Sequence, residues 1–289
     1  MNNFAIAGIQ FNAINGDNLD QMTKQVDQVM KRYPWVQMIM FGELCAFGTS
    51  FNSAQPMPGT AENHFCGIAK NYNIWLIPGS MYEINGDKIY NTAPVINPQG
   101  VVVTRHRKLY PFEPYENGVE GGQQHTVFDI PDVGRFGVSI CYDMWFPETV
   151  RALVYLGAEV ILHPTLTNTL DRDLELSIAR SSAITNQCYF IDINSSGSLG
   201  NGKSIVVGPE GEVIHQSDRN EEQIPVVLDL ERVAFSRDNG VLGLGQPLKS
   251  FRDHKVSYPQ YKTGAISDTF DRLGSLKKPE RMQQAKKRA

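Results

Sequence analysis

The chain has 289 residues, of which 41% are hydrophobic and 10% aromatic, so it can bury a sizeable core and is not a disordered chain. Its 27 basic and 31 acidic residues give a net charge of −4, and the only basic cluster is the short tail "KKPERMQQAKKRA", which argues against a nucleic-acid-binding protein. No apolar run approaches the length of a membrane span, and the start lacks the pattern of a signal peptide, so we expect no membrane segment and a cytoplasmic location.

The four cysteines, Cys45, Cys66, Cys141 and Cys188, lie far apart and form neither a CxxC pair nor a paired Cys/His spacing. A disulfide framework or a structural zinc site is therefore not expected, and each thiol must serve packing or chemistry. Free cysteine often packs as a small buried hydrophobe, and we assign that role to Cys45, Cys66 and Cys188.

The first half of the chain shows helical and strand patterns in turn. Residues 18–34 place apolar side chains on one helical face, with Asp17 or Asn18 able to cap the helix. The run "VQMIMFGE" (36–43) is apolar until its final acid, as in a strand buried on both faces. The segment "VINPQGVVV" (95–103) predicts a β-hairpin with a Pro-Gly-type turn.

The second half continues this alternation. The runs "FGVSICYD" (136–143) and "EVILHPT" (159–165) are again short and apolar, and each stops at a reactive or punctuating residue. The segment "PETVRALVYLGA" (147–158) opens with proline at a first helical position, and 171–187 is a further helix that leads into the strand "CYFIDI" (188–193). Alternating strands and helices predict the α/β class.

The domain organisation is predicted from an internal echo and from the tail. The segment "VVGPEGEVI" (206–214) resembles the hairpin at 95–103, which suggests two similar layers rather than one wound sheet. No linker rich in Gly, Ser or Pro divides the chain, so we expect one domain over residues 1–245. The periodicity then fades, and residues 246–289 are expected to form an extension that contacts another subunit or stays a flexible tail.

Cys141 differs from the other cysteines because it stands where an apolar strand is expected to end, shortly before a helix that starts at Pro147. Ligands of α/β sheets bind outside the carboxyl ends of strands, where free backbone N–H groups can also stabilise an oxyanion. A thiolate nucleophile needs a base or a nearby cation. Among the histidines only His163 ends an expected strand in a comparable way, and it could be that base or a satisfied histidine lining the site. Glu43, which ends an apolar run, and Lys108, which ends "GVVVTRHRK", fit better.

Three segments, in this order, resemble motifs of the nitrilase (carbon–nitrogen hydrolase) superfamily: "FGELCAFGTS", "RHRKLYPFEPYE" and "GVSICYDMWFPE". The resemblance implies a four-layer α-β-β-α sandwich, with two mixed sheets between helix layers, and a catalytic triad of Glu43, Lys108 and Cys141. A further family glutamate matches Glu116, whereas Glu113 in the same segment is interpreted as a solvated loop acid.

The resemblance also implies hydrolysis of a carbon–nitrogen bond through a cysteine thioester. Glu43, with a pKa raised by partial burial, would take the thiol proton. The Lys108 ammonium and the backbone N–H of Tyr142 would stabilise the oxyanion, and Glu116 would orient Lys108. No metal or organic cofactor is expected, because this chemistry needs none and the sequence shows no dinucleotide- or phosphate-binding loop.

The cysteine segment favours an amide over a nitrile, because Tyr142 and Asp143 stand where true nitrilases have a Trp-Glu pair. Trp145 stands where many omega-amidase-like relatives have an arginine, and "WFPE" looks similar to N-carbamoylputrescine amidases, whose substrates are amines. The Trp145 ring could face a cation or an apolar tail of the substrate, or it could pack in the core or at an interface.

The substrate pocket is also expected to include Tyr142 and the segment "HPTLTN", in which His163, Thr165 and Asn168 are the candidate contacts. The expected partner is thus a small-molecule amide. Members of the superfamily assemble through helices such as that near 171–188, and their C-terminal tails cross to a neighbouring subunit. The resemblance therefore implies a homodimer or a larger homo-oligomer.

Three alternatives stay open at this stage. The same triad could hydrolyse a nitrile, and the same thioester could transfer its acyl group to another amine rather than to water. The fold could also persist as a non-catalytic scaffold, although a scaffold has no need to keep Glu43, Lys108, Glu116 and Cys141.

Overall fold

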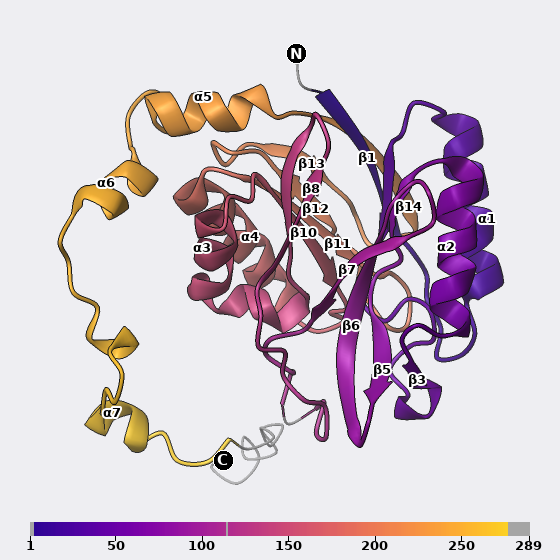
Figure 1. The fold of residues 1–289 in the computed structure, drawn as a ribbon, viewed down its shortest axis with the longest axis horizontal. Helices are drawn as coiled ribbons and strands as arrows, with labels where there is room; N and C mark the ends of the chain where they lie inside the picture. Colours follow the sequence, from indigo (N-terminus) through magenta and orange to yellow (C-terminus); the bar gives the residue numbers. More distant parts are fainter. Residues whose placement is uncertain (1–2, 114, 277–289) are drawn as a thin grey trace, which may run out of the picture.

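The protein is a sandwich of two β-sheets enclosed between two layers of helices (Figure 1). A computed structural model describes residues 3–113 and 115–276. The four layers, with two mixed sheets inside, confirm the α-β-β-α architecture implied by the sequence motifs.

The larger sheet has eight strands in the order β14-β1-β2-β4-β6-β5-β3, with β7 paired to β6. It is mixed, because β1, β2 and β4 are parallel to one another while β14 pairs antiparallel with β1. Its strands are β1 (Asn3–Gln10), β2 (Met38–Phe41), β3 (Gln55–Pro56), β4 (Trp75–Ile77), β5 (Met81–Asn85), β6 (Lys88–Ile96), β7 (Val102–Arg107) and β14 (Glu222–Asp229).

The smaller sheet has six strands in the order β13-β12-β11-β10-β9-β8, of which β9, β10 and β11 are parallel. The expected hairpins are confirmed, one in each sheet: β6 with β7, and β12 with β13. The strands of this sheet are β8 (Thr126–Ile130), β9 (Gly134–Val138), β10 (Val160–Thr165), β11 (Tyr189–Asn194), β12 (Ile205–Val207) and β13 (Val213–Gln216).

Helices α1 and α2 cover the larger sheet, and α3 and α4 cover the smaller one (Figure 1). The apolar face expected for α1 is confirmed, since it buries Met22, Val26 and Val29, and Asp17 Oδ1 accepts a hydrogen bond from Leu19 N over 2.9 Å at its start. The helices are α1 (Leu19–Arg32), α2 (Thr60–Tyr72), α3 (Pro147–Tyr155), α4 (Arg172–Asn186), α5 (Glu231–Asn239), α6 (Pro247–Asp253) and α7 (Asp268–Asp271), with 3₁₀ turns η1 (Phe51–Ser53), η2 (Cys141–Trp145) and η3 (Pro259–Tyr261).

Alternate side chains of the central strands enter two different cores. In β10, Val160 and Leu162 pack between the sheets, whereas Ile161 packs against α3 and α4. In β11, Ile191 packs between the sheets and Phe190 packs against α3 and α4. Because side chains alternate between the two faces of a strand, residues in step with Ile161 and Phe190 lie beneath the α3–α4 layer.

The two sheets approach each other closely just after β2. Glu43 N donates a hydrogen bond to Thr165 O, at the end of β10, over 3.1 Å. A Cβ at Gly42 would lie 2.8 Å from Thr165 O and 3.0 Å from Ile193 O, so this approach requires glycine. The contact places Glu43 beside the carboxyl end of β10.

Beyond α5 the chain leaves the sandwich, and residues 246–276 form an arm that curves outside the α3–α4 layer (Figure 1). The arm touches α3, where Tyr261 Oη donates to Glu148 Oε1 over 2.7 Å and the Arg151 guanidinium lies 5.2 Å from the centre of the Phe251 ring. Apolar side chains of the arm such as Ile266 are largely exposed.

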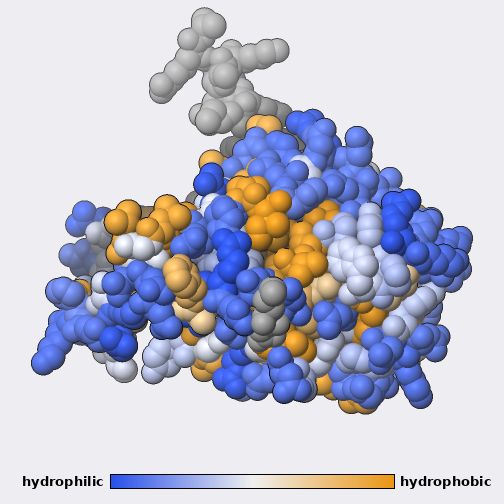
Figure 2. Space-filling view, turned by 90° about the horizontal axis from the view of Figure 1, so that it is seen from above, coloured by the Kyte–Doolittle hydropathy of each residue, from blue (hydrophilic) through white to orange (hydrophobic). Residues whose placement is uncertain are grey.

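The face shown in Figure 2 is mostly hydrophilic, with apolar residues gathered near its middle. Across residues 3–113 and 115–276, none of the helices has both the length and the apolar character needed to cross a bilayer.

Candidate active site

Glu43, Lys108 and Glu116 form a buried ionic cluster. Lys108 Nζ lies 2.8 Å from Glu43 Oε1 and 2.6 Å from Glu116 Oε2. Glu43 follows β2, Lys108 follows β7, and Glu116 lies in the loop after Lys108. The structure therefore brings together the amine and the two carboxyl groups singled out in the sequence, whereas Glu113 is exposed.

Asn91, in β6, holds both carboxyl groups and was missed by the sequence analysis. Its Nδ2 donates to Glu43 Oε1 over 2.8 Å and to Glu116 Oε1 over 3.0 Å. The backbone N–H of Phe112 adds a hydrogen bond to Glu116 Oε2 over 2.7 Å. A polar residue within a buried apolar strand was the available signal, because a buried amide needs hydrogen-bond partners.

Cys141 is the first residue of η2 and stands beside this cluster. It is 8% exposed, and its backbone adopts a φ of 47°, a left-handed conformation that non-glycine residues rarely take and that clusters at functional sites. The Glu43 carboxyl hydrogen-bonds the thiol, and the Lys108 ammonium acts on it electrostatically. Thiol, acid and amine thus converge from three distant parts of the chain.

Two details of the sequence analysis are wrong. Strand β9 ends at Val138, so Cys141 does not itself end the strand; the apolar run continues because Ile140 packs in the core between the sheets. His163 does not end its strand either, because β10 continues through Thr165, which pairs with β11.

The groups of the cluster differ in their tendency to hold a proton. Burial raises the pKa of Glu43 more than the Lys108 ammonium lowers it. Burial would raise the pKa of Glu116, but the charge and hydrogen bond of Lys108, together with hydrogen bonds from Phe112 and Asn91, lower it. Burial would lower the pKa of Lys108, but the surrounding acids raise it well above its usual value. In this cluster Glu43 is therefore the carboxyl group that accepts a proton most readily, while Glu116 stays ionised and Lys108 stays protonated. The titrations of the three groups are coupled.

Asp143 joins the cysteine segment to the lysine segment. Its buried carboxylate accepts hydrogen bonds from Leu109 N over 3.0 Å, from Tyr110 N over 2.9 Å and from Ile140 N over 2.9 Å, and it lies 3.3 Å from His106 Nε2. In the sequence this residue served only to distinguish amidases from nitrilases. Its partners lie more than thirty positions away along the chain in all but one case, so local sequence carried no signal for this role.

Aromatic side chains surround the start of η2. The half-buried Tyr142 ring lies 6.2 Å from the Trp145 ring, 4.9 Å from that of Phe112 and 5.4 Å from that of Phe146. Trp145 also packs against the core beneath α3 and α4. Trp145 thus packs in part against this core, while Tyr142 stands next to the cysteine.

The other candidate contacts differ in exposure. His163 is buried with Nδ1 2.7 Å from Ser139 Oγ, and burial lowers its pKa to about 4. The candidate base that contacts the Cys141 thiol is the Glu43 carboxyl, whereas His163 is hydrogen-bonded to Ser139. Thr165 is buried at the end of β10, and Asn168 is exposed.

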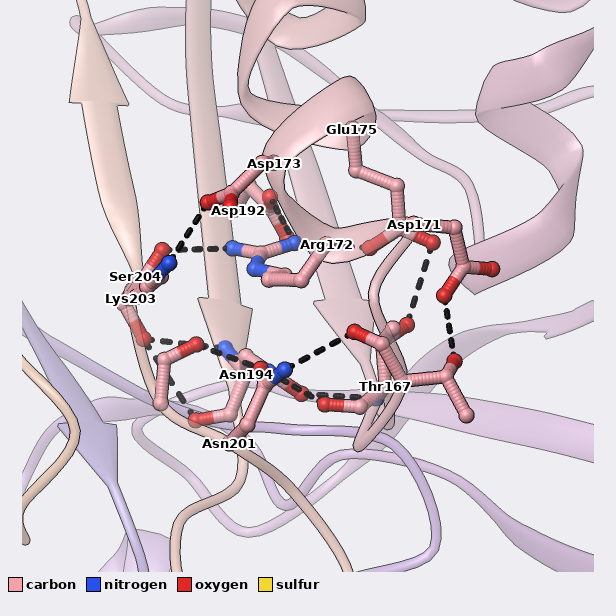
Figure 3. A network of polar contacts seen from close by, with 12 residues as sticks. Thr167, Asp171, Arg172, Asp173, Glu175, Asp192, Asn194, Asn201, Lys203 and Ser204 are labelled. Carbon is pink, nitrogen blue, oxygen red and sulfur yellow. Dashed lines mark hydrogen bonds and ion pairs between the residues drawn. The ribbon is translucent and has the colours of Figure 1, made fainter.

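A second buried network beneath α4 was also missed (Figure 3). Arg172 Nη1 lies 2.7 Å from Asp192 Oδ2 and 3.1 Å from Glu175 Oε2, and Thr167 Oγ1 donates to Glu175 Oε1 over 3.0 Å. In the sequence, Arg172 and Glu175 looked like ordinary residues of a surface helix. Neither this network nor any other group of His, Cys, Asp and Glu within the described ranges could hold a metal ion.

Comparison with known proteins adds independent information. The carbon–nitrogen hydrolase family model matches residues 5–238. The chain is 29% identical over 247 residues to the omega-amidase NIT3 of Saccharomyces cerevisiae, which covers 76% of this chain and 84% of the relative. It is 28% identical over 270 residues to a formamidase of Bacillus cereus, covering 84% and 80%. The crystal structure of Saccharomyces cerevisiae Nit3, described as a member of branch 10 of the nitrilase superfamily, matches with a TM-score of 0.76 at 28% identity, covering 82% of this chain and 94% of that chain.

Proposed function

Because the chain belongs to the carbon–nitrogen hydrolase family, we propose that it is an amidase that cleaves a small linear amide or an N-carbamoyl amine through a thioester on Cys141. The observation that carries this proposal is the contact of the Glu43 carboxyl with both the Cys141 thiol and the Lys108 ammonium in one buried cluster. Likeness to an omega-amidase and to formamidases supports hydrolysis of an amide carbon–nitrogen bond.

The first half of the reaction forms the thioester. Burial and the Glu43 charge raise the pKa of the Cys141 thiol, so the thiol keeps its proton until it attacks. Glu43, whose own pKa is raised, takes that proton as the sulfur bonds to the amide carbonyl carbon. The proton then passes to the leaving nitrogen, and the carbon–nitrogen bond breaks to release ammonia or an amine.

The second half of the reaction hydrolyses the thioester and regenerates the free enzyme. Glu43 removes a proton from water, and the resulting hydroxyl group adds to the thioester carbonyl. The carbon–sulfur bond then breaks as Glu43 returns the proton to the sulfur, which gives the acid and the free thiol. In both halves the oxyanion is stabilised by the Lys108 ammonium and by the backbone N–H of Tyr142. Glu116 and Asn91 fix Lys108 and Glu43 for this task, through hydrogen bonds of 2.6 Å and 2.8 Å respectively.

The preference for an amide rests on the residues after the cysteine. Tyr142 and Asp143 replace the Trp-Glu pair of true nitrilases, and the Asp143 carboxylate binds backbone N–H groups of the lysine segment. Tyr142 and Trp145, whose rings lie 6.2 Å apart just after Cys141, are the proposed aromatic contacts, which would suit an apolar or cationic substrate tail. His163, Thr165 and Asn168 remain the proposed polar wall.

The experiment is a panel of small amides, N-carbamoyl amines and nitriles, with ammonia release as the readout. We expect turnover of at least one amide or N-carbamoyl amine, no turnover of the matched nitrile, and no activity in Cys141→Ala. Hydrolysis of the nitrile at a higher kcat/KM than its amide would instead identify a nitrilase. Absence of any Cys141-dependent product, including an amide formed with an added amine, would favour the scaffold.

Assembly and location complete the proposal. A second copy of this chain is the proposed partner, supported by the exposed apolar side chains that the arm (residues 246–276) and α4 present, such as Ile266 and Leu174. Size-exclusion chromatography with light scattering tests this, and a monomeric mass would refute it. We also propose a cytoplasmic location, which the four free thiols support; cell fractionation tests it.

A further inference from the structure

The segment 165–167, which starts at the last residue of β10, touches both members of the proposed catalytic pair. Thr165 O accepts a hydrogen bond from Glu43 N over 3.1 Å. The backbone of Leu166 hydrogen-bonds the Cys141 sulfur. The position of this segment therefore helps to set the distance between the Glu43 carboxyl and the sulfur.

Thr167 anchors that segment through three buried hydrogen bonds (Figure 3). Its N–H donates to Asn194 Oδ1 over 2.9 Å, and its carbonyl accepts from Asn194 Nδ2 over 2.9 Å. Its hydroxyl donates to Glu175 Oε1 over 3.0 Å. The backbone is thus held by β11, and the side chain is held by α4.

Glu175 is itself fixed by an ionic network of residues that are at most 2% exposed. Arg172 binds Glu175 and Asp192, and its Nη2 donates to Lys203 O over 2.8 Å. Two carboxyl groups share one guanidinium, so the network holds more negative than positive charge, and burying such charge is costly. Burial raises the pKa of Glu175 to about 7, with the Arg172 guanidinium opposing the rise and the Asp192 charge adding to it.

The Glu175 charge also reaches the proposed nucleophile. Burial and the Glu43 charge raise the pKa of the Cys141 thiol, the Lys108 ammonium lowers it, and Glu175 raises it. The charged groups around Glu175 are Arg172 on its own helix and Asp192 on β11. Glu175 is therefore linked to the sulfur twice, through the hydrogen-bonded segment and through its charge.

We propose that Glu175 is a positioning residue of this site: through Thr167 it fixes the segment that contacts Glu43 and Cys141, and its charge sets the reactivity of the Cys141 sulfur. The inference rests on the proposed function for its kinetic test. Its second test, alkylation of the thiol, needs no substrate.

The kinetic test compares Thr167→Val with Thr167→Ser. Valine keeps the shape of threonine but removes the donor to Glu175, and serine restores the hydroxyl. For Thr167→Val we expect kcat to fall about 10- to 100-fold with KM changed less than about threefold. The substitution leaves the Glu175 carboxyl without its donor, the segment shifts, and a misplaced sulfur slows the chemical step more than it weakens substrate binding. Thr167→Ser is expected to recover most of the lost kcat.

The alkylation test follows the reaction of Cys141 with iodoacetamide across pH, in a Cys66→Ser background because Cys66 is partly exposed and would also react. Peptide mass spectrometry reports modification of Cys141. Glu175→Gln keeps an acceptor for Thr167 and removes the negative charge, so we expect the midpoint of the pH curve to move down by about half a unit or more. In Thr167→Val, the midpoint is expected to move less than in Glu175→Gln.

The outcomes separate the two proposals. Wild-type kcat in Thr167→Val, an equal loss in Thr167→Ser, or an unchanged alkylation curve in Glu175→Gln would each overturn the role of Glu175. Turnover by Cys141→Ala would overturn the proposed function instead. If Thr167→Val does not fold, the isosteric Glu175→Gln variant still decides the inference.

Discussion

The Asp143 carboxylate accepts a hydrogen bond from the backbone N–H of Tyr110 over 2.9 Å, although 33 positions separate the two residues. The neighbouring N–H of Leu109 binds the same oxygen over 3.0 Å. A single buried side chain thereby ties the segment that carries Lys108 to the segment that carries Cys141. The alignment of amine and sulfur depends on this tie.

Asp143→Ala is expected to lower the free energy of unfolding by about 3–5 kcal/mol, because it leaves one buried and two partly buried backbone N–H groups without their acceptor. Urea denaturation followed by tryptophan fluorescence measures the effect. Asp129→Ala is the matched control, since Asp129 forms an exposed ion pair with Arg135 and should matter little. Equal effects of the two substitutions would show that Asp143 does not support the fold in this way.

Glu116→Gln is expected to lower kcat by about 100-fold, because the amide loses the negative charge that keeps the Lys108 ammonium oriented and charged. Glu113→Gln, in the same loop but exposed, should retain kcat within about twofold. Steady-state ammonia release on the best amide compares them. Similar kcat values for both variants would remove Glu116 from the proposed machinery.

Gly42→Ala is expected to reduce kcat at least about tenfold and to lower Tm, because the new methyl group would lie 2.8 Å from Thr165 O and push Glu43 away from β10. Gly67→Ala is the control, because a Cβ at Gly67 in α2 meets no atom within 4 Å. That variant should gain up to about 1 kcal/mol of stability from the higher helix propensity of alanine. A fully active Gly42→Ala protein would contradict the close approach of the two sheets.

His163→Asn is expected to flatten the pH dependence of stability between about pH 6.5 and pH 4. Burial lowers the His163 pKa to about 4, so in this window the unfolded chain binds a proton that the folded protein does not, and stability falls as the pH falls. The groups facing the imidazole are Ser139, Asp192, Asp143 and, at longer range, Arg172 and Lys108.

The magnitude follows from the difference between the two pKa values, which corresponds to about 3 kcal/mol lost by the wild type across the window. Asparagine keeps a polar group near Ser139 but does not titrate. Urea unfolding at several pH values measures both proteins. Parallel curves for wild type and His163→Asn would show that His163 is protonated to the same extent in both states.

The fold and the central trio were predictable because their signals are local. Glu43 and Cys141 stand at the ends of short apolar runs, Lys108 ends the expected strand "GVVVTRHRK", and the three segments resemble superfamily motifs in the correct order. The family match and the likeness to Nit3 confirm the superfamily and the four-layer sandwich. The choice of Glu116 over Glu113 likewise followed from spacing, and the structure buries the first and exposes the second.

The supporting residues were not predictable because their partners come from packing between distant elements. Asn91 binds acids 48 and 25 positions away, and Glu175 is buried because α4 lies on the end of β11, where Asp192 points toward the helix layer. A sequence pattern shows that Glu175 lies on a helix, but not which side of that helix is covered. The left-handed backbone conformation of Cys141 was not predictable either, because a positive φ at a non-glycine residue leaves no mark in the sequence.

Ammonia release by Cys141→Ala, compared with Cys45→Ala, tests the proposed nucleophile most directly. Both thiols are buried, but Cys45 Sγ lies 3.3 Å from Ser195 Oγ, while the Cys141 thiol is hydrogen-bonded to the Glu43 carboxyl. We expect Cys141→Ala to lose at least about 10⁴-fold in kcat with an unchanged near-ultraviolet circular dichroism spectrum, and Cys45→Ala to stay within about threefold of wild type. A folded Cys141→Ala protein that still releases ammonia within about tenfold of the wild-type rate would contradict the convergence of sulfur, acid and amine as the reacting centre.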